Sequence, residues 1–251
     1  MFSDIQSFTT LSESMEPEQL TMMLNEYLSE MSRMIIEEGG TIDKYIGDAI
    51  VAFWNAPADV QNHAAVAVST CLNYQKRLSE LNENFKLKYG KKIFARIGLN
   101  TGDAVVGNMG SDLRFDYSMF GDSVNLASRL EGLNKQFGTY FICSEQTKLE
   151  TELCLNDIYW QKMGKIIVVG KTEAINIYEP IRMNDYLTNK QNYDLFTQGI
   201  NYFYDGNFDL AKTAFTGVAD YYEPAKKYLA KCDFFIANPI LWTGVLVSNS
   251  K

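Results

Sequence analysis

Residues 39–57, GGTIDKYIGDAIVAFWNAP, contain two short apolar stretches on either side of a Gly47-Asp48 pair. Their β-branched and aromatic side chains, with Gly-Asp between them, are typical of two strands joined by a tight turn. The pattern therefore predicts a β-hairpin with strands at residues 41–46 and 49–54. Because strands need partners and cover, the flanking sequence decides which kind of sheet this hairpin joins.

Helical patterns lie on both sides of the hairpin. Residues 17–38 and 58–85 repeat apolar side chains at three- and four-residue steps, which predicts amphipathic helices. Helices and strands alternate, yet several strands adjoin through turns, so we predict an α+β sheet with helices on one face rather than a doubly wound sheet. The remaining predicted elements are strands at 94–100, 105–109, 115–119, 140–143, 158–162, 166–169 and 176–178, and a helix at 123–137.

Composition excludes several classes of protein. The 251 residues are 46% apolar and 22% charged, which is ordinary for a globular chain of one or two domains. The net charge of −8 argues against a nucleic-acid partner, because phosphate neutralisation needs clustered Lys and Arg. No run of 18 apolar residues and no signal-peptide pattern is present, so no membrane contact by this chain is expected. The four widely spaced cysteines are interpreted as reduced thiols of a cytoplasmic protein.

The character of the chain changes near residue 182. Residues 190–236 lack strand signals and place Tyr, Phe and Ala at helical spacing. The sequence therefore predicts two domains, 1–181 and a small helical extension at 182–251, which we expect to pack on the first domain or on a partner. A plain helical hairpin explains the extension as well as a tetratricopeptide unit does. The residues that fit the small and large positions of such a unit are Leu195, Gly199, Tyr202, Phe208, Ala211, Phe215 and Pro224.

Acidic residues are the first candidates for chemistry. The chain has no P-loop, dinucleotide fingerprint or G-x-S-x-G motif, and its one histidine, His63, lies in a predicted helix. Asp4 ends the first predicted strand, and Asp48 lies in the hairpin turn. Neighbouring strand ends would place the two carboxylates close enough to share a divalent cation such as Mg²⁺ or Mn²⁺. Asp is common at strand ends and turns, so the pair alone does not decide the matter.

A second candidate lies in residues 115–132, FDYSMFGDSVNLASRLEG. Asn125 and Arg129 are four residues apart and share one face of the predicted helix. A planar guanidinium beside a neutral amide suits a phosphoryl group and a sugar. A solvated helix face accounts for the same spacing.

Four motifs occur in an order that resembles the catalytic domain of class III nucleotidyl cyclases. The resemblance covers about residues 1–181 and implies a ferredoxin-like α+β domain that works as a head-to-tail homodimer with two composite sites. It also implies the reaction: the ribose 3′-hydroxyl of ATP attacks the α-phosphate, giving cyclic AMP and pyrophosphate, with two Mg²⁺ or Mn²⁺ ions per site. The motifs are FSDIQSFT (2–9), GGTIDKYIGDAIVAFWNAP (39–57), RIGLNTGDAVVGNMGS (96–111) and YSMFGDSVNLASRLEGLNK (117–135).

Matched position by position, the resemblance assigns roles to five residues. Asp4, Asp48 and the backbone carbonyl of Ile5 correspond to the metal ligands of the family. Asn125 corresponds to the amide that orients the ribose, and Arg129 to the arginine that stabilises the transition state. In the family the aspartates come from one subunit, and the amide, the arginine and the base-selecting pair come from the other.

Lys44 and Ser118 correspond to the two positions that select the base. Lys44 can donate to adenine N1, and the Ser118 hydroxyl can accept from the exocyclic amine, whereas guanine presents the opposite polarity. The resemblance therefore implies an adenylyl cyclase. A serine at position 118 resembles the Ser/Thr subgroup that includes bicarbonate-responsive cyclases, which makes bicarbonate a candidate regulator.

One position departs from the family pattern. The family usually has V-K-G-K near its C-terminal hairpin, and its first lysine contacts the triphosphate. Residues 168–171 of this chain are V-V-G-K, so Val169 stands at that position. Another lysine, either Lys171 or Lys165, could take the place of the missing lysine, and we take Lys171 as the substrate-binding substitute. Otherwise the affinity for the triphosphate falls by roughly 1.5–3 kcal/mol, the contribution of one charge-assisted contact.

Two alternatives and one expectation about context remain. A degenerate cyclase domain could act as a dimerising sensor of nucleotide or bicarbonate, and a guanylyl cyclase is opposed by Lys44 and Ser118. Residues 1–5 look like the end of a buried strand whose start is missing. The helical extension resembles tails of bacterial membrane-bound receptor cyclases. Together they predict a cytoplasmic output domain of a longer signal-transduction protein with an upstream membrane or sensor domain.

Overall fold

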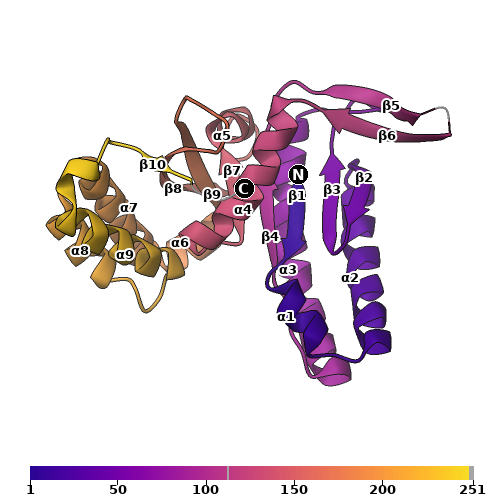
Figure 1. Ribbon diagram of the computed structural model, residues 1–251, viewed down its shortest axis with the longest axis horizontal. Helices are drawn as coiled ribbons and strands as arrows, with labels where there is room; N and C mark the ends of the chain where they lie inside the picture. Colours follow the sequence, from indigo (N-terminus) through magenta and orange to yellow (C-terminus); the bar gives the residue numbers. More distant parts are fainter. Residues whose placement is uncertain (112, 249–251) are drawn as a thin grey trace. The chain divides into compact units, whose positions relative to one another are not determined.

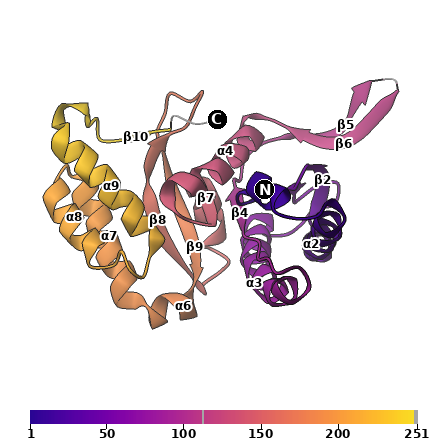
Figure 2. The same ribbon diagram turned by 60° about the horizontal axis from the view of Figure 1, so that its bottom comes forward.

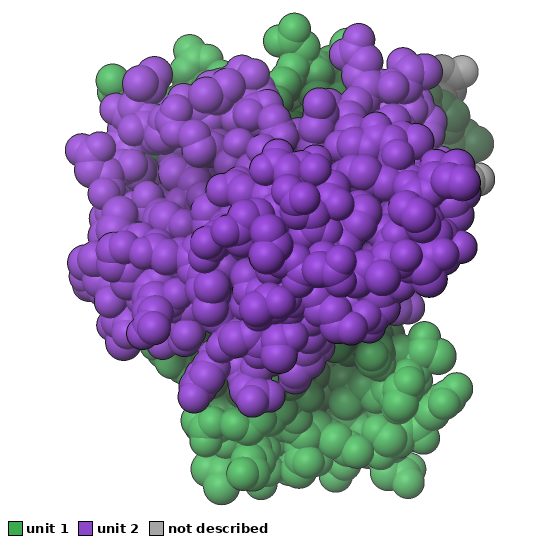
Figure 3. Space-filling model, turned by 90° about the vertical axis from the view of Figure 1, so that its left-hand side faces the viewer, with its two compact units in different colours: residues 1–131 green, residues 132–251 purple. Residues whose placement is uncertain are grey.

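The computed structural model describes residues 1–111 and 113–248. The chain forms two compact units that divide between residues 131 and 132 and are coloured separately in Figure 3. Helix α4 (Asp122–Phe137) runs through this division. The predicted boundary between residues 181 and 182 falls inside the second unit, where strand β9 ends. The helical extension is therefore part of the second compact unit.

The first unit contains a sheet whose described strands have the spatial order β4-β1-β3-β2. The predicted hairpin forms β2 and β3, and β1 inserts between β3 and β4. All three pairings are antiparallel, with Phe2 opposite both Val51 and Gly98. The elements are β1 (Phe2–Ile5), α1 (Phe8–Glu13), α2 (Pro17–Glu37), β2 (Thr41–Ile46), β3 (Ala49–Phe53), α3 (His63–Tyr89) and β4 (Ala95–Leu99).

Helices α2 and α3 lie side by side against one face of this sheet (Figures 1 and 2). α2 buries one stripe at helical spacing, which includes Tyr27 and Ile35, as the sequence predicts. The predicted helix at 58–85 is wrong at both ends. Residues 58–62 are irregular, and Gly90, in the left-handed conformation, follows the last helical residue.

Helix α4 covers the opposite face of the sheet. The Ser3 hydroxyl lies 2.8 Å from the Tyr74 hydroxyl of α3, so Asp4, the next residue of β1, faces the other way. On that side a Cβ at Gly98 would overlap the backbone of α4 at Glu131. The prediction of helices on one face is therefore wrong, because glycine at position 98 lets α4 approach β4 closely. As a result, Asp4 and α4 share one face.

A separate two-stranded hairpin extends from the first unit (Figure 1). It consists of β5 (Val105–Ser111) and β6 (Arg114–Phe120), with Gly107 opposite Ser118. Its base is buried at Ser118. The hairpin exposes large apolar side chains at its base, with Val105 at 68%, and toward its tip, with Phe115 at 62%. This hairpin therefore presents apolar surface that the first unit itself does not cover.

In the second unit the described strands have the order β10-β8-β9-β7. The strands predicted at 158–162 and 166–169 are one strand, β8, whose register with β9 shifts between Lys162 and Gly164. In the helical extension at residues 182–251, called the tail below, aromatic rings of α7 and α9 pack on one another, and α7 contacts β8. The elements are β7 (Phe141–Ser144), α5 (Glu145–Thr151), β8 (Ile158–Ile167), β9 (Ile175–Arg182), α6 (Met183–Thr188), α7 (Lys190–Tyr204), α8 (Phe208–Thr216), α9 (Glu223–Ala237), the 3-10 helix η1 (Pro239–Leu241) and β10 (Leu246–Val247).

Two expectations from composition can be compared with this fold. The four cysteines, which all lie in the described ranges, form no disulfide, and Cys154 is the one of the four that is exposed. Within the described ranges, no helix has both the length and the apolar character that crossing a bilayer requires.

Candidate active site

Strand pairing brings Asp4 and Asp48 together. β1 and β3 are antiparallel with Ser3 opposite Ile50, so the end of β1 lies beside the start of β3. The backbone N–H of Ile5 donates to Asp48 Oδ2 at 3.0 Å. The two carboxylates therefore meet where the two strand ends adjoin.

The Asp4 carboxyl group is strongly affected by this arrangement. Burial, and next the charge of Asp48, raise the pKa of Asp4 to about 6, while the Arg96 guanidinium partly opposes the rise. Two adjacent carboxylates are oxygen ligands suited to a hard divalent cation, which would relieve their repulsion. Among the described residues no group of three or more His, Cys, Asp and Glu side chains could hold a metal ion. The pair thus fits a metal whose other ligands are a backbone carbonyl such as that of Ile5, water or phosphate.

Two charged neighbours of this pair were missed by the sequence analysis. Arg96 lies opposite Asp4 in the β1–β4 pairing. Burial, followed by the charge of Asp4, raises the pKa of Glu131 on α4 to about 7. The proximity of Arg96 to Asp4 depends on the register of β4, and that of Glu131 depends on the position of α4. Local sequence patterns therefore gave no signal for either residue.

The two residues predicted to select the base are also in contact. Lys44 Nζ on β2 donates to Ser118 Oγ on β6 at 3.2 Å, and Ser118 is 2% exposed. Lys44 and Asn125 line a cavity of about 210 Å³. Apolar walls with a few polar groups suit the flat faces and polar edge of a purine. The other lining residues are Phe2, Asp43, Ile46, Val51, Met119, Phe120, Gly121 and Val124.

Asp43 is a further residue of this pocket that the sequence analysis missed. Strict alternation would place Asp43 and Lys44 on opposite faces of β2, but the β2–β3 register shifts between Ile42 and Lys44. Both side chains therefore line the pocket. The Asp43 side chain is 3% exposed, and its Oδ1 lies 3.5 Å from Lys44 Nζ. A buried carboxylate thus lies beside the Lys44 ammonium group in the pocket.

Arg129 and Asn125 lie one turn apart on α4, as predicted. Asn125 is exposed and lines the pocket, whereas Arg129 is half-buried. Within the described residues, the buried Nη1 of Arg129 has no hydrogen-bond partner. A buried donor without an acceptor carries a desolvation cost that a bound anion would remove. The Arg129 guanidinium therefore fits a phosphate ligand.

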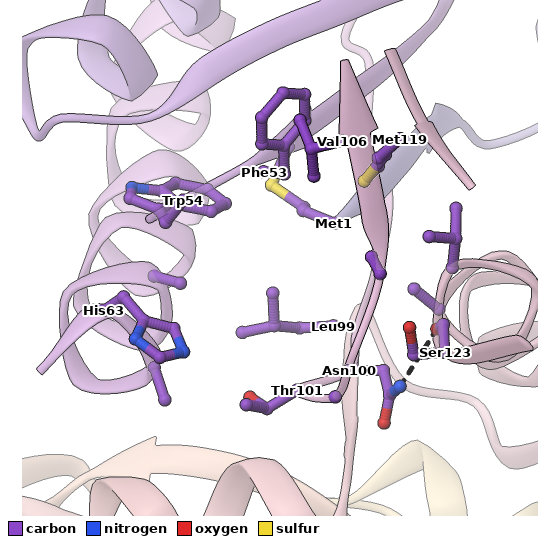
Figure 4. Close-up of a pocket in the computed structure, with 16 residues that line it drawn as sticks. Met1, Phe53, Trp54, His63, Leu99, Asn100, Thr101, Val106, Met119 and Ser123 are labelled. Carbon is purple, nitrogen blue, oxygen red and sulfur yellow. Dashed lines mark hydrogen bonds between the residues drawn. The ribbon is translucent and has the colours of Figure 1, made fainter. Parts of the chain in front are cut away.

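A second, smaller cavity of about 110 Å³ lies in the first unit (Figure 4). His63, the first residue of α3, lines it together with Trp54. At its edge the Asn100 side-chain amide donates to the Ser123 carbonyl at 2.9 Å, as the dashed line in Figure 4 shows. The Ser123 hydroxyl in turn donates to the Asp103 carbonyl at 2.5 Å. These bonds fix the start of α4, which carries Asn125 two residues later.

The candidate triphosphate residues belong to the second unit. Residues 168–174 join β8 to β9, and the Lys171 N–H donates to the Val168 carbonyl at 3.0 Å within this loop. Val169 and Lys171 are half-buried, and Lys165 is exposed on β8. The structure thus places Lys171 in the loop itself and Lys165 in the strand before it.

The sheet, the paired aspartates and the polar pocket define a nucleotidyl cyclase catalytic domain of α+β fold. The family described as "Adenylate and Guanylate cyclase catalytic domain" matches residues 1–179, and the chain belongs to this family. It is 36% identical over 181 residues to adenylate cyclase 1 of Rhizobium meliloti, covering 72% of this chain and 27% of that protein. It is 39% identical over 185 residues to the adenylate cyclase of Anabaena cylindrica, covering 71% and 36%. The chain thus spans about a third of the length of these relatives.

Solved structures agree with this assignment. The adenylyl cyclase CyaB from P. aeruginosa has a TM-score of 0.65 and 36% sequence identity, over 72% of this chain and 91% of that one. The guanylyl cyclase Cya2 has a TM-score of 0.64 and 31% identity, over 71% and 88%. The predicted α+β cyclase fold is therefore confirmed.

Proposed function

We propose that this chain is an adenylyl cyclase, a phosphorus–oxygen lyase that converts ATP to 3′,5′-cyclic AMP and pyrophosphate. The observation that carries the proposal is the 3.2 Å contact between Nζ of Lys44, which lines the pocket, and Oγ of the buried Ser118. Lys44 has only donors and suits the unprotonated N1 of adenine, while Ser118 can accept from the exocyclic amine. Guanine would present its N1–H to the ammonium, which is a contact between two donors.

The other site residues bind the ribose, the phosphates and the metal ions. Asn125 orients the ribose, so that its 3′-hydroxyl oxygen bonds to the α-phosphorus while the bond to pyrophosphate breaks in line. Arg129 donates from its unpaired Nη1 to the α-phosphate, where negative charge builds in the transition state. Asp4, Asp48 and the Ile5 carbonyl would hold two Mg²⁺ or Mn²⁺ ions, which lower the pKa of the 3′-hydroxyl and neutralise phosphate charge.

The proposal includes a head-to-tail homodimer with composite sites. The cavity lined by Lys44 and Asn125 is lined by neither Asp4 nor Asp48. One chain therefore offers a base-binding half and a metal-binding half at separate places. The exposed apolar side chains of the β5–β6 hairpin supply surface that a second copy would bury.

Finer features of the resemblance are part of the same proposal. Lys171 replaces the triphosphate lysine absent at Val169, and bicarbonate is a candidate regulator through the Ser118 subgroup. The tail is a tetratricopeptide-like unit, supported by Gly199, whose missing side chain makes room for the Phe215 ring. The chain acts as the cytoplasmic output part of a bacterial signal-transduction protein with an upstream membrane or sensor domain.

One assay tests this function and its alternatives. The purified chain is incubated with Mn²⁺ and either ATP or GTP, and the cyclic products are quantified, with Asp48→Ala as the matched inactive control. We expect cyclic AMP from the wild type only. Val169 favours the degenerate-domain alternative, which the absence of both products from a folded dimer would support. A preference for GTP would instead identify a guanylyl cyclase.

A further inference from the structure

Two tyrosines of the tail bind the backbone of β8 at its bulge. The Tyr228 hydroxyl of α9 donates to the Met163 carbonyl. The Tyr204 hydroxyl of α7 accepts from the Lys165 N–H at 2.7 Å and donates to the Lys165 carbonyl at 3.1 Å. Between them lies Gly164, where a Cβ would overlap both hydroxyls. The tail therefore supplies the hydrogen-bond partners of the strand where its regular ladder is interrupted.

The end of the tail continues along the same strand. Leu246 and Val247 of β10 pair in parallel with Ile166 and Ile167 of β8. The Ser248 N–H adds a hydrogen bond to the Ile167 carbonyl at 2.9 Å. Contacts from the tail thus accompany β8 from residue 163 to residue 167, which is the last residue before the 168–174 loop.

The tail also contacts the end of α4. Lys231 Nζ of α9 donates to the Gln136 carbonyl at 3.1 Å, where cations are favoured by the helix dipole. The same ammonium lies 5.0 Å from the centres of the Phe137 and Tyr228 rings. Gln136 Nε2 lies 3.2 Å from Ser248 Oγ. The tail therefore holds both β8 and the last turn of the helix that carries Arg129.

We propose that the tail is a positioning element of the cyclase, in which Tyr204 and Tyr228 fix the bulge of β8 and thereby the loop that presents Lys171 to the triphosphate. This inference rests on the proposed function. The order of a loop depends on the order of the strand ends that anchor it. Near the end of β8 that leads into the 168–174 loop, the tyrosine hydroxyls supply hydrogen bonds where the regular ladder is interrupted. Both tyrosines are positioning residues, because they act on substrate through the loop.

The test compares single hydroxyl deletions in the full chain. Tyr204→Phe and Tyr228→Phe keep the ring packing and remove the bonds to β8, together with the hydrogen bond that the two hydroxyls share. Tyr202→Phe is the matched control on α7, since its hydroxyl accepts from Gln198 instead of binding β8. The readouts are hydrogen exchange of residues 163–175, the KM for ATP, the kcat, and inhibition by inorganic pyrophosphate.

For Tyr204→Phe and Tyr228→Phe we expect exchange in this segment to accelerate about tenfold, as a lost hydrogen bond of about 1.4 kcal/mol would allow. The KM for ATP and the inhibition constant of pyrophosphate should rise several-fold, with kcat nearly unchanged, and Tyr202→Phe should resemble the wild type. Faster exchange with an unchanged KM would overturn the positioning role, as would unchanged exchange. A wild type without any cyclic product would refute the proposed function, while the exchange comparison would still test whether the tail anchors the loop.

Discussion

The Lys44 ammonium nitrogen lies 3.2 Å from the Ser118 hydroxyl oxygen, although the two residues are 74 positions apart in the sequence. The contact joins β2, at the edge of the described sheet of the first unit, to β6 of the extending hairpin. Packing of the Phe53 and Tyr117 rings, with centroids 6.1 Å apart, supports the same junction. The donor-only group of Lys44, which lines the pocket, is thereby held against the buried Ser118 hydroxyl, and the proposed recognition of the base depends on this arrangement.

Replacing Asp48 with Asn should lower the pKa of Asp4 from about 6, because the charge of Asp48 is one cause of its elevation. Burial, the larger cause, remains, so the pKa should stay above the ordinary value of 3.8. Carbonyl ¹³C NMR titration of the metal-free chain measures the change. Asp48→Asn should also abolish cyclisation without loss of folding. An unchanged pKa would show that the two carboxylates do not interact.

Asp48→Ala and Arg129→Ala chains, each inactive alone, should recover activity when mixed. In a symmetric homodimer with composite sites, random exchange makes about half of the dimers mixed, and each mixed dimer has one intact site. We therefore expect about a quarter of the wild-type rate, measured after subunit exchange has been verified by mass. No recovery would mean that each site is built within one chain.

Gly98→Ala should destabilise the first unit by roughly 1–3 kcal/mol, because the added Cβ would overlap the backbone of α4 at Glu131, which cannot rotate away. Gly132→Ala is the matched control, since a Cβ there meets nothing within 4 Å. It should stabilise α4 by about 0.5–1 kcal/mol. Urea unfolding measures both free energies, and equal effects of the two substitutions would contradict the close approach of β4 and α4.

Glu179→Gln should change how stability depends on pH. Burial raises the pKa of Glu179 to about 7 from its ordinary 4.5, while a hydrogen bond from Tyr222 partly opposes the rise. Folding therefore takes up a proton between these values, and the contribution to stability, complete below pH 4.5, is lost as pH rises through 7. Relative to the wild type, Glu179→Gln should gain in melting temperature from pH 4.5 to pH 8.

The exposed Glu173 of the same unit provides the matched control. Glu173→Gln should show no such pH-dependent difference from the wild type. If Glu179→Gln also differs from the wild type by a constant amount at every pH, the Glu179 carboxyl does not titrate as its burial requires.

Local patterns predicted the local structure well. The hairpin at residues 39–57 was confirmed because alternation and a Gly-Asp turn act within a few residues. The bulge at Asp43 was missed, since it depends on how β2 registers with β3. The placement of α4 was wrong because the close approach at Gly98 is a tertiary contact that residue spacing does not encode.

The residues of the candidate site, too, were predictable only where a local pattern marks them. Asp4 and Asp48 were found as strand-end acids, and antiparallel pairing brings them together. The roles of Lys44 and Ser118 came only from resemblance, because a lysine in a strand and a serine in a hairpin have no pattern of their own. Arg96, the charged residue opposite Asp4, was missed because the sequence alone does not give the register between β1 and β4.

The most direct test of the account is kcat/KM for ATP and for GTP in the wild type and in Lys44→Glu, with Mn²⁺. The wild type should prefer ATP. In Lys44→Glu an acceptor faces adenine N1, also an acceptor, so the ATP value should fall by about 10- to 100-fold. Adding Ser118→Cys should restore some GTP turnover, since Glu can accept from guanine N1–H and N2–H. If Lys44→Glu keeps the ATP value within a factor of about three, which is under about 1 kcal/mol, Lys44 does not read the base and the adenylyl assignment is contradicted.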